Sequence, residues 1–172
     1  MLQTDTAIDP QVIREAFNED RTQMTLMLAR KMNVPEIEVI RALEGDLSKE
    51  LEFTRWEELI RSFEEFGNVH VIVSNGAVTL EAFGQFGKFS NTDGFFNVQS
   101  KSLDMHIRTW ELAFIFAFRK PSHTDGREAI SFQFFDRHGA AAFKVFFAFG
   151  GHDPSPELMQ KYNNLTEKFA KQ

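Results

Sequence analysis

The sequence predicts an α+β fold in which small N-terminal helices are followed by a large antiparallel β-sheet and a C-terminal helix. Three patterns predict it. Apolar residues recur at helical spacing in the first third of the chain, they alternate with period two from about residue 67 to residue 150, and Ser155-Pro156 then begins a last helical stretch. Because the strands follow one another without helices between them, this order favours antiparallel pairing over a doubly wound parallel sheet.

A chain of 172 residues can bury one core, so a single domain over residues 1–172 is expected. Its parts are a helical lobe at 1–66, the antiparallel sheet at 67–150 and the C-terminal helix at 151–172. The net charge of −6 argues against nucleic acid or an anionic membrane as partner. Without cysteine, an apolar run of roughly 20 residues or a secretory leader, the sequence predicts a cytoplasmic protein with no membrane insertion.

Residue types at the helix ends predict where the helices of the lobe begin. Asp9-Pro10 is typical of an N-cap followed by the first helical residue, and Thr54-Arg55-Trp56-Glu57 resembles a capping box. The segment 28–43 has the outline of a helix-turn-helix motif. Acidic residues outnumber basic ones in its second helix, so two packed helices are favoured over a DNA-reading pair.

The period-two region predicts a series of strands. Asn75-Gly76 is suited to a hairpin turn after a strand in which His70 and Ser74 share one face. Further strands are expected at about 95–100, 102–108, 112–119, 129–136 and 142–149. Phenylalanine is unusually frequent, with 20 residues, and the sequence predicts one continuous aromatic wall on the sheet made of Phe114, Phe116, Phe118, Phe132, Phe134, Phe143, Phe147 and Phe149.

The candidate binding residues lie in the strand Leu103 to Arg108. Alternation turns Asp104, His106 and Arg108 to the same face, so an imidazole and a guanidinium share a surface. An imidazole can ligate haem iron and an arginine can pair with a propionate, so this spacing suits a haem that lies across a sheet. A solvated strand edge is the alternative interpretation.

The sequence offers other possible ligands besides His106. His70 is the other histidine expected on a sheet face, whereas His123, His138 and His152 lie in turn sequences, and Tyr162 falls in the buried stripe of its helix. Neither a phosphate-binding glycine loop, a metal-protease pair nor a serine nucleophile elbow is present, so general acid/base catalysis is not suggested.

Several segments together resemble a known family. They are 94–102 (GFFNVQSKS) running into Met105-His106-Ile107-Arg108, then 127–136, 139–146 and the hairpin 71–76. This pattern resembles the cytosolic haem-utilisation carriers of bacteria, the HutX-type family, which is related to two-repeat haem-trafficking and haem-degrading proteins of the HemS-like fold. The likeness runs from about Val12 to Phe149.

The resemblance implies a homodimer that binds haem of the b type, with His106 as the axial ligand of the iron. It further implies that Arg108 and Lys101 supply basic groups near the pocket. Ser74 stands where some relatives carry histidine, which leaves three alternatives: the iron is five-coordinate, it takes His70 as its second ligand, or the function of this chain has drifted from that of the family. The implied function is haem binding, buffering and transfer in haem-iron utilisation by a non-catalytic carrier. The alternatives are a haem-degrading, haem oxygenase-like enzyme and a non-haem regulatory or interaction protein.

Overall fold

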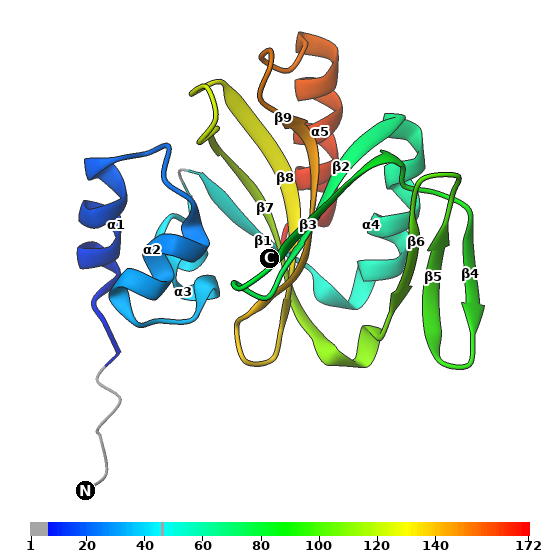
Figure 1. Cartoon of the computed structure of the whole chain (residues 1–172), viewed down its shortest axis with the longest axis horizontal. Helices are drawn as coiled ribbons and strands as arrows, with labels where there is room; N and C mark the ends of the chain where they lie inside the picture. Colours follow the sequence, from blue (N-terminus) through cyan, green and yellow to red (C-terminus); the bar gives the residue numbers. More distant parts are fainter. Residues whose placement is uncertain (1–6, 46) are drawn as a thin grey trace, which may run out of the picture.

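The computed structural model describes residues 7–45 and 47–172 as three groups of elements (Figure 1). The N-terminal helices lie on one side, a six-stranded sheet occupies the centre, and a three-stranded sheet lies on the side far from the helices. Residues 1–6 of the predicted helical lobe and Asp46 lie outside the described residues. The α+β class, with a large antiparallel sheet and a C-terminal helix, is confirmed.

The lobe contains α1 (Pro10–Glu19), α2 (Thr25–Met32) and α3 (Glu36–Ala42). Asp9 caps α1 as predicted, because its carboxylate accepts a hydrogen bond from the Gln11 amide at 2.8 Å. The buried residues of these helices form a second core against Phe116, Phe118 and Phe135 of the large sheet. The helices therefore cover one face of that sheet.

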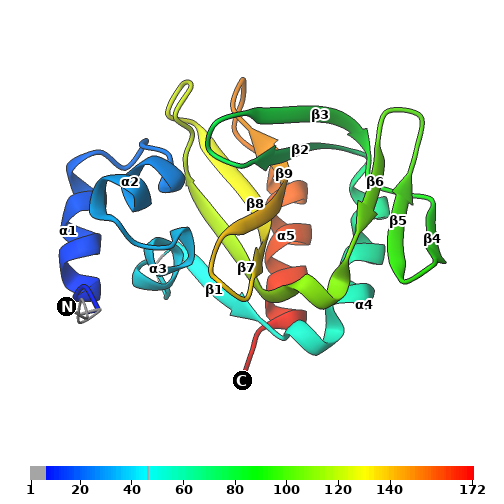
Figure 2. The same ribbon diagram turned by 60° about the horizontal axis from the view of Figure 1, so that its bottom comes forward.

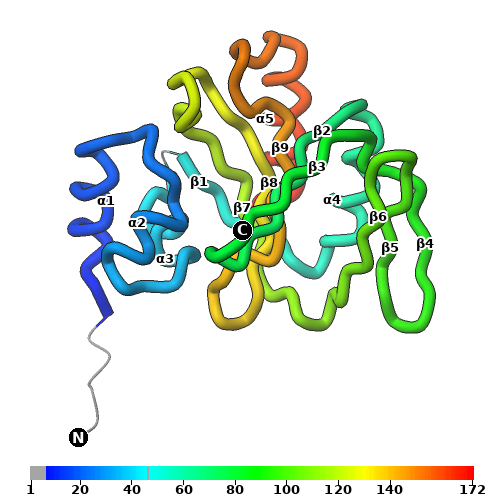
Figure 3. Tube along the Cα trace, in the orientation of Figure 1, coloured from blue at the N-terminus to red at the C-terminus, as the bar shows by residue number. Residues whose placement is uncertain are grey.

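The large sheet is antiparallel throughout, in the order β1-β7-β8-β9-β2-β3. Figures 2 and 3 show how strongly it twists between the N-terminal helices and the far end of the molecule. The strands are β1 (Ser48–Leu51), β2 (Asn68–Ser74), β3 (Thr79–Gln85), β7 (Leu112–Pro121), β8 (Glu128–Asp136) and β9 (Ala141–Phe149).

Two sequence expectations about these strands need correction. The region 1–66 is not wholly helical, because the four-residue strand β1 pairs with residues 115–118 of β7, and four residues are too few to establish a period. The strands of 67–150 also form two sheets rather than one. The second contains β4 (Phe89–Thr92), β5 (Phe95–Gln99) and β6 (Asp104–Ile107).

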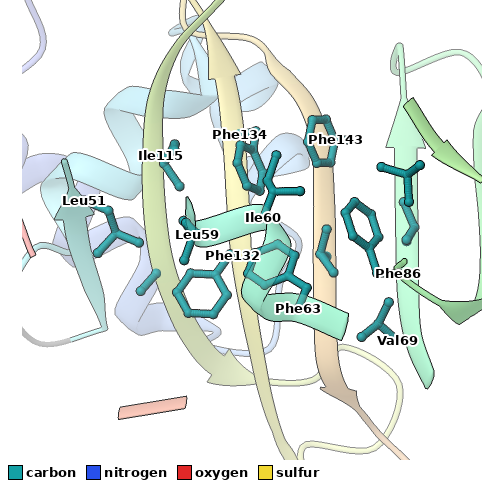
Figure 4. Packing of buried hydrophobic residues seen from close by; sticks show 14 of the residues in the cluster. Leu51, Leu59, Ile60, Phe63, Val69, Phe86, Ile115, Phe132, Phe134 and Phe143 are labelled. Atoms are coloured by element: carbon teal, nitrogen blue, oxygen red, sulfur yellow. The ribbon is translucent and has the colours of Figure 1, made fainter. Parts of the chain in front are cut away.

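The main core lies under the other face of the large sheet, against α4 (Trp56–Ser62) and α5 (Pro156–Phe169). Figure 4 shows Leu59 and Ile60 of α4 beside Phe132 and Phe134 of β8. Phe63 begins the 3-10 turn η2 (Phe63–Phe66) and stacks on Phe132 with ring centroids 5.3 Å apart. Tyr162 is buried in this core as predicted, and its hydroxyl donates to the Ser131 carbonyl at 3.1 Å. In the described part of the chain, none of the helices is long and apolar enough to span a membrane.

The capping box predicted at Thr54 is wrong. A 3-10 turn, η1 (Phe53–Arg55), precedes α4, and the Glu52 carboxylate accepts hydrogen bonds from the Thr54 amide at 3.2 Å and its hydroxyl at 2.9 Å. Glu57 instead pairs with Arg61 one turn later, at 2.7 Å. The extra turn shifts the helix start by one residue, so Arg55 rather than Thr54 occupies the N-cap position.

The single aromatic wall is also wrong, because strand register divides the phenylalanines between two faces. Phe116 and Phe118 lie opposite Gln133 and Ser131 and face the N-terminal helices. Phe132 and Phe134 alternate with those polar residues and enter the main core, together with Phe143 and Phe147. An irregularity in the pairing of β8 with β9 then turns Phe149 to the opposite face, where it contacts His70.

Candidate functional site

The predicted binding residue His106 lies on β6, and the alternation of that strand is as expected. Met105 and Ile107 pack into the main core, whereas Asp104 and His106 project outward. The exposed fraction of the His106 side chain is 56%. The imidazole is therefore presented to solvent on the outer face of the small sheet.

A buried asparagine holds this imidazole. Asn97 of β5 lies directly opposite His106 in the antiparallel register, and its Oδ1 is 2.7 Å from His106 Nδ1. The Asn97 amide is oriented in turn, because its Nδ2 donates to Ser90 Oγ at 3.2 Å. With Oδ1 as the acceptor, Nδ1 must carry the proton, and the lone pair is on the outward Nε2. Second-shell hydrogen bonds of this kind orient metal-ligating histidines.

Aromatic side chains extend the surface from the imidazole in one row, His106 to Phe95 to Trp110. Phe95 lies edge-on to His106 with centroids 6.3 Å apart, and Trp110 lies 5.9 Å from Phe95. Trp110, in the 3-10 turn η3 (Thr109–Glu111), is 53% exposed, which is unusual for so large an apolar side chain. The guanidinium of Arg108 lies 5.5 Å above the Phe95 ring. We call His106, Phe95, Arg108 and Trp110 the His106 platform.

One acidic side chain borders the platform. Asp104 Oδ1 lies 3.5 Å from His106 Nε2 and accepts a hydrogen bond from Gln99 Nε2 at 3.1 Å. Its side chain is 68% exposed. A grouping of three or more His, Cys, Asp or Glu side chains able to hold a bare metal ion does not occur among residues 7–45 and 47–172. The chemistry that the platform supports is a single imidazole ligand beside an aromatic ledge and a cation.

The structure does not bring all the predicted site residues together. Arg108 shares the platform with His106, and Lys101 is exposed in the turn between β5 and β6. His70 lies on the large sheet instead, where its Nε2 is 3.3 Å from Glu81 Oε2 and its ring is 4.6 Å from Phe149. His70 and His106 thus belong to different sheets within one chain.

Sequence reasoning missed the roles of Asn97 and Trp110. A polar residue between Phe96 and Val98, both buried, was the available signal for Asn97, but only the register shows that it faces His106. It also missed a cavity of about 200 Å³ between α2 and the large sheet. His106 is not among the residues that line this cavity.

The known proteins that this chain resembles are described as heme transport or heme-binding proteins. The intracellular heme transport protein HutX of Vibrio cholerae serotype O1 is 23% identical over 151 residues, covering 87% of this chain and 76% of that protein. The structure of the heme binding protein ChuX superposes with a TM-score of 0.78 at 21% identity, covering 91% of this chain and 97% of ChuX.

A third similar structure is longer. The holo form of PhuS, a heme-binding protein from Pseudomonas aeruginosa, has a TM-score of 0.77 at 23% identity and covers all of this chain, but only 49% of PhuS is matched. At these identities the structural likenesses establish the fold. Residues 49–165, more than half of the chain, match the model of the family described as haem utilisation ChuX/HutX. The protein therefore belongs to the ChuX/HutX family.

Proposed function

We propose that this protein binds haem of the b type reversibly at the His106 platform and passes it on within the cell during haem-iron utilisation. The observation that carries the proposal is the hydrogen bond from His106 Nδ1 to the buried Asn97, which leaves Nε2 available as an iron ligand. The family membership and the transport and haem-binding descriptions of HutX and ChuX support it.

The donor set of the platform fits a haem. One neutral imidazole can supply the axial ligand, Phe95 and Trp110 offer an aromatic ledge for the porphyrin ring, and Arg108 is placed to pair with a propionate carboxylate. Lys101 is a second exposed cation at the end of the same β5–β6 hairpin. An exposed site with one ligand favours release, which a carrier needs.

We propose that the working form is a homodimer. The platform can cover only one face of a porphyrin, so a second chain would supply the other wall. β3 is an edge strand of the large sheet, with Leu80 61% and Phe83 65% exposed, which suits association of two copies. Because this chain matches 49% of PhuS, two copies would equal one PhuS chain in length.

Titration with hemin, followed by the Soret absorbance, tests the function. The wild-type protein is expected to saturate at one haem per chain, and His106→Ala to weaken binding by at least roughly tenfold and alter the band, because the axial ligand is gone. His138→Ala, which removes an exposed histidine in the β8–β9 turn, is the control and should leave the titration unchanged. An unchanged spectrum in His106→Ala would remove His106 from the site.

Two further measurements complete this experiment. If His70 of either chain is the second ligand, the wild-type spectrum is six-coordinate and His70→Ala should make it five-coordinate. If His70 is not a ligand, the wild-type spectrum is five-coordinate and His70→Ala should leave it unchanged. Incubating the loaded protein with a reductant, air and catalase separates the carrier from a haem-degrading enzyme. The carrier keeps its haem, whereas the enzyme releases iron and an open-chain tetrapyrrole.

A further inference from the structure

Asp104 lies beside the nitrogen that the proposed function assigns to the iron. It precedes His106 by two residues on β6, so the two side chains share the outer face of the small sheet. The distance from Asp104 Oδ1 to His106 Nε2 is 3.5 Å. A metal held by this nitrogen therefore has the carboxylate as a close neighbour.

A hydrogen bond across the strands orients the carboxylate. Gln99 lies directly opposite Asp104 in the register of β5 with β6, and its Nε2 donates to Asp104 Oδ1 at 3.1 Å. The same register places Asn97 opposite His106. The ligand and the carboxylate are thus each held by the residue that faces them on β5.

The negative charge of Asp104 has no cation to neutralise it. Among the residues that the structure describes, neither a lysine nor an arginine forms an ion pair with this carboxylate. Arg108 lies over the Phe95 ring instead, and Lys101 is exposed in the turn between β5 and β6. The platform therefore presents one unpaired anion beside the ligand nitrogen.

Such a charge distinguishes the two oxidation states of haem iron. The centre of a ferric porphyrin has a net positive charge, because the trivalent metal sits in a dianionic ring, whereas the centre of a ferrous porphyrin is neutral. A fixed anion beside the metal attracts the first and acts little on the second. Because Asp104 is exposed, water and salt weaken the attraction, so we expect an effect of about tenfold in relative affinity.

We propose that Asp104 is a specificity-determining residue, whose charge makes the His106 platform bind ferric haem in preference to ferrous haem. The inference rests on the proposed function, because it requires the iron to be held by His106 Nε2. It adds the oxidation state of the cargo: the protein takes up haem in the ferric form, and reduction of the iron by one electron weakens binding.

The reduction potential of the haem-loaded protein tests the proposal. Asp104→Asn removes the charge but keeps the size of the side chain and an acceptor for Gln99. In a dithionite titration with redox mediators, followed by the Soret band, this variant should have a potential about 59 mV above that of the wild type, which corresponds to a ferric-to-ferrous affinity ratio about tenfold smaller. Glu157→Gln removes the same charge from an exposed position of α5 and should leave the potential unchanged.

Two other metalloporphyrins give a measurement without electron transfer. Gallium(III) protoporphyrin has the positive centre of ferric haem, and zinc(II) protoporphyrin has the neutral centre of ferrous haem. Asp104→Asn should bind the gallium compound about tenfold more weakly than the wild type does and the zinc compound equally well. Raising the salt concentration from about 0.05 M to about 1 M should reduce the difference between the two proteins, because salt screens an exposed charge.

The outcomes separate this inference from the function on which it rests. If His106→Ala binds hemin as the wild type does, the proposed function and the role of Asp104 are both contradicted. If His106→Ala binds hemin weakly but Asp104→Asn keeps the wild-type potential, only the role of Asp104 is overturned. Equal weakening of gallium and zinc porphyrin binding in Asp104→Asn would overturn it as well, because a general disturbance of the site, unlike the loss of a charge, affects both compounds.

Discussion

At the scale of single residues, the pair Asn97 and His106 carries the proposed chemistry. The two face each other across β5 and β6, and the asparagine is 5% exposed whereas the histidine is open to solvent. Burial makes the Asn97 amide costly to leave unpaired, so its bonds to Ser90 and His106 are both retained. A rigid buried group thus orients an exposed ligand.

Asn97→Leu tests this positioning role. Loss of the acceptor removes the preference for a proton on Nδ1, so the free protein should populate the Nε2–H tautomer of His106, and haem affinity should fall by about 10–100-fold. Nitrogen-15 NMR of the imidazole reads the tautomer without haem, and the Soret titration reads the affinity. Asn91→Leu, at an exposed position of β4, is the control. Imidazole signals that are unaltered in Asn97→Leu would refute the role of Asn97.

At the scale of elements, the sequence predicts the starts of α1 and α5 correctly but not the start of α4. Asp9 before Pro10 and Ser155 before Pro156 both act as N-caps, as the sequence predicts, because an N-cap needs only its own next few residues. The start of α4 was not predicted correctly. There Glu52 bonds Thr54 within a 3-10 turn, an alternative that the same local residues allow.

Ser155→Ala measures the contribution of one such cap. The Ser155 hydroxyl accepts from the Leu158 amide at 3.1 Å, and its loss should destabilise the fold by about 1 kcal/mol, because α5 covers the main core. For a chain of this size that corresponds to a fall in Tm of about 2–4 °C, measured by thermal unfolding. Ser155→Asp keeps an accepting side chain and should retain the wild-type Tm. An equal fall in both variants would mean that the cap is not the cause.

At the scale of the whole molecule, polar contacts join the N-terminal helices to the sheet. Lys120 of β7 donates to the Thr22 carbonyl between α1 and α2, and Arg30 of α2 donates to the Gly76 carbonyl in the β2–β3 turn at 2.9 Å. Burial, with a smaller contribution from the charge of Lys144, lowers the pKa of Lys120 from its ordinary 10.5 to about 8. The lobe is therefore attached partly through a lysine that is costly to keep charged.

This lysine predicts a pH dependence of stability. Below pH 8 both the folded and unfolded states carry the proton and the burial penalty is complete; between pH 8 and 10.5 the unfolded state binds more protons, so the free energy of unfolding rises with pH. The ceiling is about 3 kcal/mol, reduced by the solvent that reaches the ammonium. In urea titrations, wild type should therefore gain stability relative to Lys120→Met from pH 7.5 to 10. A constant difference would refute the shifted pKa.

The sequence by itself determined the α+β class, the caps at Asp9 and Ser155, and the outward face of His106 and Arg108. Each of these follows from the period of one segment or from neighbours a few residues apart. Only the tertiary structure decided which face each phenylalanine takes, that Asn97 lies opposite His106, that His70 is on another sheet, and that a cavity lies beneath α2. The physical reason is that alternation orders the faces within one strand, whereas the phase between strands depends on register and on bulges set by long-range pairing.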